Sequence, residues 1–121
     1  MKIQTDRMLS AADAATALLK ALANRRRLAI VCQLIEKERS VGELAALMKT
    51  RDSTVSQHLA LLRKDGLVSA RRDAQTIWYS IASDAARGIV AALYRAYCAP
   101  TATCAPKRTK AARRRALEPN Q

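Results

Sequence analysis

Cysteine and histidine are the residues of this chain best suited to redox or metal chemistry. There are three cysteines, Cys32, Cys98 and Cys104, and one histidine, His58. An odd number of cysteines without a C-x-x-C pair forms neither a disulfide framework nor a thioredoxin-like site, so we expect reduced thiols in a cytoplasmic protein. By spacing alone, Cys32 fits a small buried apolar residue and Cys98 an incidental position at the end of a helix.

No other combination of residues suggests an enzyme. The sequence contains no carboxylate pair, no nucleophile–histidine constellation and no glycine-rich phosphate loop, which are the usual signatures of catalytic or nucleotide-binding sites. It also lacks the roughly 18 consecutive apolar residues of a membrane span, and its N-terminus lacks the continuous apolar core of a secretory signal. We therefore expect no enzymatic activity, no cofactor and no membrane partner.

The net charge indicates a polyanionic partner. The 121 residues include 22 lysines and arginines against 10 aspartates and glutamates, a formal charge of +12. A strongly basic chain attracts polyanions, of which nucleic acid is the first candidate. Six positive charges lie in residues 107–115, and such charge runs favour disorder. At this length one domain is expected: a flexible N-terminus over 1–9, a folded domain over 10–98 and a basic disordered tail over 99–121.

Apolar periodicity predicts a mainly helical fold. Leucine, valine and isoleucine recur at helical spacing, and residues that cap helices precede each run. Helices are predicted over residues 11–22 and 25–37, from Ser40 to Met48, and from residue 52 or 53 to Gly66. The predicted N-terminal caps are Ser10, Asn24, Ser40 in a capping box with Glu43, and Asp52 or Ser53.

The period of the sequence changes after Gly66. Two β-type runs, residues 67–72 and 76–81, flank Asp73-Ala74-Gln75 and predict a hairpin. A last helix is predicted from Ser83 to about Cys98. The order is therefore four helices, two strands and a final helix. Two short helices followed directly by a basic hairpin are typical of a winged helix-turn-helix, which binds duplex DNA.

The predicted helix after residue 52 has the properties of a DNA-recognition helix. Such a helix needs polar side chains on its outer N-terminal turns, so that they reach base edges in the major groove. Here these are Ser53, Thr54, Ser56, Gln57 and His58, while Val55, Leu59 and Leu62 are expected to face the core. Phosphate contacts are predicted for Lys49, Arg51, Arg63 and Lys64, and contacts to the backbone or minor groove for Arg71, Arg72 and Gln75 on the hairpin.

Residues 40–81, SVGELAALMKTRDSTVSQHLALLRKDGLVSARRDAQTIWYSI, resemble the ArsR/SmtB family of bacterial winged-helix repressors. The shared patterns are V-x-x-L-A and S-x-V-S-x-H-L-x-x-L-R-x-x-G-L-V, and the similarity extends over about residues 10–98. One departure is Asn24-Arg25-Arg26-Arg27, where the family has D-P-T-R. The resemblance implies a homodimer formed through the first and last helices, bound to an inverted-repeat operator until an inducer releases it.

The same resemblance bears on the inducer. Arsenic sensors of the family carry C-V-C where this chain has Ser40-Val41-Gly42, and zinc sensors use aspartate and histidine on the last helix, which here offers Asp84 and no histidine. Cys32 and Cys98 instead resemble the cysteine pair of the sulfide-responsive branch (the SqrR/BigR-type repressors). This implies that reactive sulfur species or oxidants cross-link the two thiols and that the repressor then releases DNA.

Two other functions stay open at this point. Cys32, Cys98 and Cys104 offer soft ligands to a thiophilic metal, which would make the chain a metal-responsive repressor of the same fold. The basic tail offers a general attraction to nucleic acid, which would make it a binding protein without sequence preference.

Overall fold

A computed structural model of the chain describes residues 1–98. The chain divides into two compact units, Met1–Val90 and Ala91–Gln121. The basic tail expected over residues 99–121, including Cys104, lies outside the described residues.

The element order confirms a mainly helical fold with a β-hairpin. The helices are α1 (Thr5–Ser10), α2 (Ala12–Leu22), α3 (Arg25–Glu36), α4 (Val41–Met48), α5 (Asp52–Lys64) and α6 (Asp84–Tyr97). The strands are β1 (Arg39–Ser40), β2 (Val68–Asp73) and β3 (Thr76–Ile81). Two of these elements, α1 and β1, are additions to the predicted order.

Two helices begin at residues that the sequence predicts as caps, and a third begins at the predicted start Ser83. The side-chain oxygen of Asn24 accepts from the backbone N–H groups of Arg26 and Arg27, at 2.9 and 3.1 Å. Ser40 and Glu43 form the predicted capping box, each side chain pairing with the other's backbone N–H at 3.2 Å. At the start of α6, the hydroxyl of Ser83 accepts from the backbone N–H of residue 86 at 3.0 Å. Such caps satisfy N–H groups that have no partner within the helix.

Two predicted caps are wrong. The hydroxyl of Ser10 donates to the carbonyl of Arg7 at 2.9 Å, because Ser10 completes the last turn of α1 instead of beginning α2. The N-cap of α5 is Arg51, and no side chain caps this helix. Asp52 lies one position later, in the first turn, where a negative charge is favourable near the positive end of the helix dipole.

The predicted end of α5 at Gly66 is confirmed in detail. Gly66 has φ +80°, and its N–H bonds the carbonyl of Arg63 at 3.0 Å while the N–H of Leu67 bonds that of Leu62 at 2.9 Å. These two bonds form a Schellman motif, which needs a left-handed residue that glycine adopts without steric cost. The motif turns the chain from α5 directly into β2.

The sheet has three antiparallel strands in the order β1-β3-β2. The hairpin register pairs Asp73 with Thr76, so Ala74 and Gln75 form a two-residue turn. On the other edge, the two residues of β1, Arg39 and Ser40, pair with Tyr79 and Trp78 of β3. The hairpin is therefore attached to the helical part by a very short third strand.

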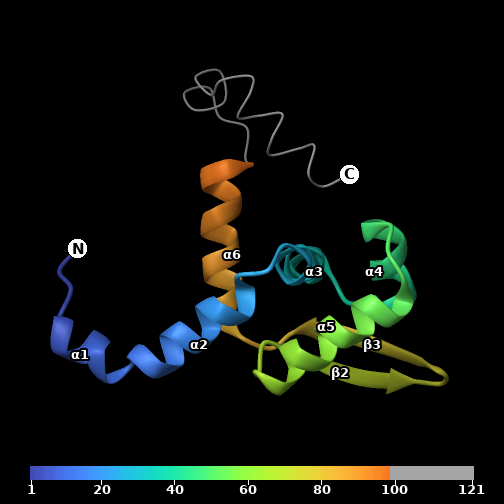
Figure 1. The fold of residues 1–121 in the computed structure, drawn as a ribbon, viewed down its shortest axis with the longest axis horizontal. Helices are drawn as coiled ribbons and strands as arrows, with labels where there is room; N and C mark the ends of the chain where they lie inside the picture. Colours follow the sequence, from blue (N-terminus) through green and yellow to red (C-terminus); the bar gives the residue numbers. More distant parts are fainter. Residues whose placement is uncertain (99–121) are drawn as a thin grey trace. The chain divides into compact units, whose positions relative to one another are not determined.

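The core lies beneath α5. Val55, Leu59 and Leu62 on one face of this helix are fully buried, as the sequence predicts. They pack in one cluster with buried residues of α3, α4, β2 and α6, among them Ile30, Leu44, Val68 and Val90. Figure 1 shows the hairpin running alongside α5. The core therefore fixes both α5 and the hairpin within the unit Met1–Val90.

Candidate nucleic-acid interface

The outer face of α5 presents polar side chains to solvent. Ser53, Ser56 and Gln57 are exposed, while Val55 between them is fully buried. Hydroxyl and amide groups can donate and accept hydrogen bonds at base edges. Thr54, also predicted for this face, is half-buried. Apolar residues therefore anchor one face of α5 in the core, and the opposite face is open to a partner.

His58 differs from the other predicted recognition residues. Its side chain is half-buried, and its Nδ1 atom is buried without a hydrogen-bond partner in the described part of the chain. Burial lowers the pKa of this imidazole, and repulsion from Arg27 and Arg26 of α3 lowers it further. His58 is thus a neutral residue beside α3 at neutral pH rather than a freely exposed contact.

The turn before α5 is built on an unusual backbone. Lys49 has φ 55° and ψ 50°, a left-handed conformation that residues with a Cβ rarely adopt. Its N–H bonds the carbonyl of Ala46 at 3.3 Å, and the N–H of Thr50 bonds that of Ala45 at 3.0 Å. The turn leaves the side chains of Lys49 and Arg51 exposed, next to the first turn of α5.

An open groove of about 460 Å³ lies between α5 and β3. It is lined by Ser56, Ala60, Arg63, Lys64 and Tyr79. Two cations, a hydroxyl and a phenol along one groove offer donors to the phosphates of a nucleic-acid backbone, and phosphate contacts fix how a protein sits on a duplex. Arg63 and Lys64 are both exposed, as their predicted role requires.

The two hairpin arginines lie on opposite faces of the sheet. Adjacent residues of a strand point to opposite sides, and the register places Arg71 opposite Trp78 but Arg72 opposite Ile77. Arg72 therefore shares its face with Tyr79, which lines the groove. The two arginines look equivalent in the sequence, whereas the strand register separates them.

Arg71 forms an ion pair with an acidic residue far from it in the sequence. Its Nε and Nη2 atoms donate to the two carboxylate oxygens of Glu38, at 2.9 and 2.8 Å, and its Nη1 lies 3.9 Å from Asp73. The hydrogen bond to Arg71 lowers the pKa of Glu38, and the same bond raises the pKa of Arg71. Glu38 and Arg71 lie 33 residues apart, so no local sequence pattern indicates this pair.

The cysteines belong to different units. Cys32, on α3, is half-buried and packs against the core of the first unit. Cys98 follows α6 in the second unit, where its side chain is exposed and its N–H bonds the carbonyl of Tyr94 at 2.8 Å. Within residues 1–98, no three histidine, cysteine, aspartate or glutamate side chains are grouped as a metal site.

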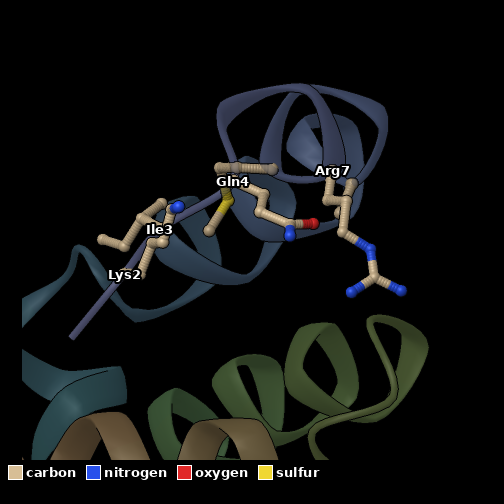
Figure 2. Close-up of a pocket in the computed structure, with 6 residues that line it drawn as sticks. Lys2, Ile3, Gln4 and Arg7 are labelled. Atoms are coloured by element: carbon tan, nitrogen blue, oxygen red, sulfur yellow. The ribbon is translucent and has the colours of Figure 1, made fainter.

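A second hollow, of about 470 Å³, lies on the N-terminal segment and α1. Its lining residues are Lys2, Ile3, Gln4, Arg7, Met8 and Ala11. All six are exposed, and Figure 2 shows the Arg7 guanidinium extending away from Lys2 and Ile3. The hollow is a concave stretch of surface without a convergent polar group.

In the described portion, no helix is long and apolar enough to cross a membrane.

The chain resembles bacterial regulatory proteins in sequence. Residues 18–70 match the family model of bacterial regulatory proteins of the arsR family. The chain is 49% identical to the transcriptional activator HlyU of Vibrio cholerae over 84 residues, which are 69% of this chain and 78% of that protein.

Solved structures show the same fold. The crystal structure of the transcriptional repressor BigR from Xylella fastidiosa superposes with a TM-score of 0.76 and 38% identity, covering 81% of this chain and 100% of that one. The solution structure of a homodimeric winged helix-turn-helix DNA-binding domain from Mycobacterium bovis has a TM-score of 0.66 and 34% identity, covering 79% of this chain and 89% of that one.

Proposed function

Because this chain belongs to the arsR family of bacterial regulatory proteins, we propose that it is a homodimeric transcriptional repressor that releases its operator when sulfur chemistry joins Cys32 to Cys98. HlyU is a transcriptional activator and BigR a transcriptional repressor, and the chain is accordingly a regulator of transcription rather than an enzyme. The proposal includes a cytoplasmic location, where thiols stay reduced until the inducer arrives.

The observation that carries the DNA-binding part is the division of α5 into two faces. Val55, Leu59 and Leu62 anchor the helix without exposure, whereas Ser53 and Gln57 project outward from its first two turns. A helix with this division can lie in the major groove without loss of core packing. We assign base contacts to Ser53, Thr54, Ser56 and Gln57, and a supporting role within α5 to the half-buried His58.

Exposed cations surround this helix on several sides. Lys49 and Arg51 lie before it, and Arg63 and Lys64 lie in its last turn. We assign to them contacts with phosphates, which strengthen binding to any duplex and orient the recognition helix. Arg72 and Gln75 extend these phosphate contacts to the β2–β3 hairpin, which is the wing of the fold.

Exposed apolar side chains support the dimer. Met8, Leu9 and Leu19 of α1 and α2 are exposed, as are Tyr94 and Tyr97 of α6. Apolar surfaces of this kind are favourable at protein interfaces. The homodimeric state of the Mycobacterium bovis domain is consistent with an association of two copies, which we assign to α2 and α6, the helices predicted as the first and the last. A dimer with two recognition helices matches an inverted-repeat operator.

In the proposed thiol switch, the two cysteines exchange sulfur with inorganic polysulfide. The exposed Cys98 attacks as a thiolate, breaks an S–S bond of the polysulfide and becomes a persulfide while hydrosulfide leaves. The Cys32 thiolate then attacks Cys98 Sγ, and the outer sulfur leaves as a second hydrosulfide. The two thiols lose two electrons, which reduce the polysulfide, and their protons pass to the departing sulfur species.

The test begins with selection of a duplex by the wild-type protein from a random library of about 30 bp, long enough for two half-sites about one helical turn apart. Binding to the selected duplex is then measured before polysulfide, after polysulfide and after reduction. We expect wild type and the control variant Cys104→Ser to release the duplex and rebind it on reduction, whereas Cys32→Ser and Cys98→Ser stay bound.

Each part of the proposal can fail separately. If the wild-type protein enriches no duplex, the DNA-binding function is wrong. Equal release of all four proteins, or mass spectrometry without a Cys32–Cys98 cross-link after polysulfide treatment, contradicts the switch alone. A reporter gene placed behind the selected duplex distinguishes repression from the activation that the name of HlyU describes.

A further inference from the structure

We infer that Arg72 is the arginine of the wing that contacts DNA phosphate, and that Arg71 is a positioning residue, held by Glu38, that fixes the angle of the wing. This inference rests on the proposed function, since it concerns how the protein binds DNA. It assigns different roles to two adjacent arginines that carry the same charge.

The contact between Arg71 and Glu38 has the geometry of a strong ion pair. Two guanidinium atoms, Nε and Nη2, meet the two oxygens of one carboxylate at 2.9 and 2.8 Å. Bidentate pairs of this kind add geometric specificity to their electrostatic energy. The third nitrogen, Nη1, is directed to Asp73 at 3.9 Å. A phosphate would therefore have to displace Glu38 to form a bidentate contact with Nε and Nη2 of Arg71.

Arg72 has the opposite surroundings. It is exposed, and none of the carboxylates in residues 1–98 forms an ion pair with it. The register places it on the face of the sheet that carries Tyr79, and Tyr79 lines the groove together with Arg63 and Lys64. Arg72 therefore extends the cationic surface of the groove along the wing.

The position of Glu38 explains why the pair sets the angle of the wing. Glu38 lies between α3 and β1, and β1 holds the edge of the sheet through only two residues. Ser40 of β1 pairs with Trp78, which pairs with Arg71. The ion pair therefore spans from the helical part to the far strand of the hairpin, beyond the reach of β1. A wing whose angle is fixed before binding loses less conformational entropy when the complex forms.

The experiment compares three variants on the selected duplex, by the slope of log affinity against log salt. Arg71→Gln and Arg72→Gln remove the same charge from adjacent positions. We expect Arg72→Gln to make the slope shallower by about 0.9 for each bound protomer, while Arg71→Gln leaves the slope unchanged and lowers affinity through a mobile wing. Thermal unfolding of each variant is measured alongside.

The third variant exchanges the two charges, Glu38→Arg together with Arg71→Glu, at constant net charge. We expect it to keep the wild-type slope and to recover the affinity that Arg71→Gln loses, because the pair is re-formed in reverse. A shallower slope for Arg71→Gln than for Arg72→Gln, or a larger loss of affinity in the exchanged variant than in Arg71→Gln, overturns the inference. Failure of the wild-type protein to select any duplex instead refutes the proposed function on which it rests.

Discussion

Burial and the nearby Arg27 guanidinium of α3 together hold the pKa of His58 on α5 below its ordinary value of 6.5. The buried Nδ1 atom has no hydrogen-bond partner in the described residues. Protonation of the imidazole therefore places a positive charge near Arg27 and Arg26, and a proton on Nδ1 has no acceptor. This electrostatic interaction links the first turn of α3 to the middle of α5.

His58 is expected to make stability depend on pH. Its pKa is lower in the folded than in the unfolded state, so the unfolded state binds more protons between the two values and stability rises with pH. The contribution is fully present above the unfolded pKa, near 6.5, and is lost as the pH falls toward the folded pKa. We expect His58→Gln to reduce the difference in urea midpoint between about pH 7.5 and about pH 5.5. Because His58 is the only histidine, equal differences in wild type and variant would contradict this assignment.

Truncation of two leucines of α5 is expected to change the free energy of unfolding by very different amounts. Leu59 has no exposed surface, whereas Leu61 is 48% exposed. Leu59→Ala leaves a cavity and should lower the free energy of unfolding by about 2–5 kcal/mol. The control Leu61→Ala should change it by about 0.5 kcal/mol or less. Chemical denaturation of both variants checks the prediction, and similar losses would mean that α5 is not anchored as described.

The turn of the hairpin stores backbone strain. Ala74 has φ 58°, a conformation that costs a residue with a Cβ about 1–2 kcal/mol. We expect Ala74→Gly to stabilise the protein by about 1 kcal/mol, since glycine adopts this φ without a clash. The same change at the exposed helical position Ala46 should destabilise by a similar amount. Thermal unfolding of the two variants must therefore shift in opposite directions; a loss in both would rule out strain at the turn.

Loss of a base contact and loss of a phosphate contact are expected to have different effects on DNA binding. Gln57→Ala should cost about 1–3 kcal/mol of discrimination at one base pair of each half-site, with the salt dependence unchanged. Arg63→Gln should weaken binding to all duplexes alike and reduce the salt slope by about 0.9 for each bound protomer. Competition assays with single-base variants of the selected duplex, repeated at several salt concentrations, measure both effects. A change of base preference in Arg63→Gln would contradict its role as a phosphate contact.

Features that depend on neighbouring residues are predictable from this sequence. The caps at Asn24 and Ser40, the stop at Gly66 and the hairpin around residues 74–75 are all confirmed, because each is determined by a few adjacent side chains. The cap at Ser10 fails because α1 has no buried residue, and hence no apolar pattern that could reveal it. β1 is missed because two residues show no alternation.

Relationships across long sequence distances required the structure. Arg71 and Arg72 look equivalent in a run of basic residues, and only the strand register and the bond to Glu38, 33 residues earlier, distinguish them. His58 fits the polar face of α5 by type and spacing, yet its side chain is half-buried, and Arg27 and Arg26 of α3 lower its pKa. In both cases the decisive neighbour lies about 30 residues earlier in the sequence.

Helix α3 joins three of the features described above. It carries Arg27 in its first turn and Cys32 near its middle, and it ends at Glu36, two residues before Glu38. One helix therefore connects the thiol of Cys32 to Glu38, which holds Arg71 of the hairpin. If the proposed cross-link at Cys32 displaces α3, the displacement is expected to reach Arg71 through two residues of backbone and the ion pair with Glu38.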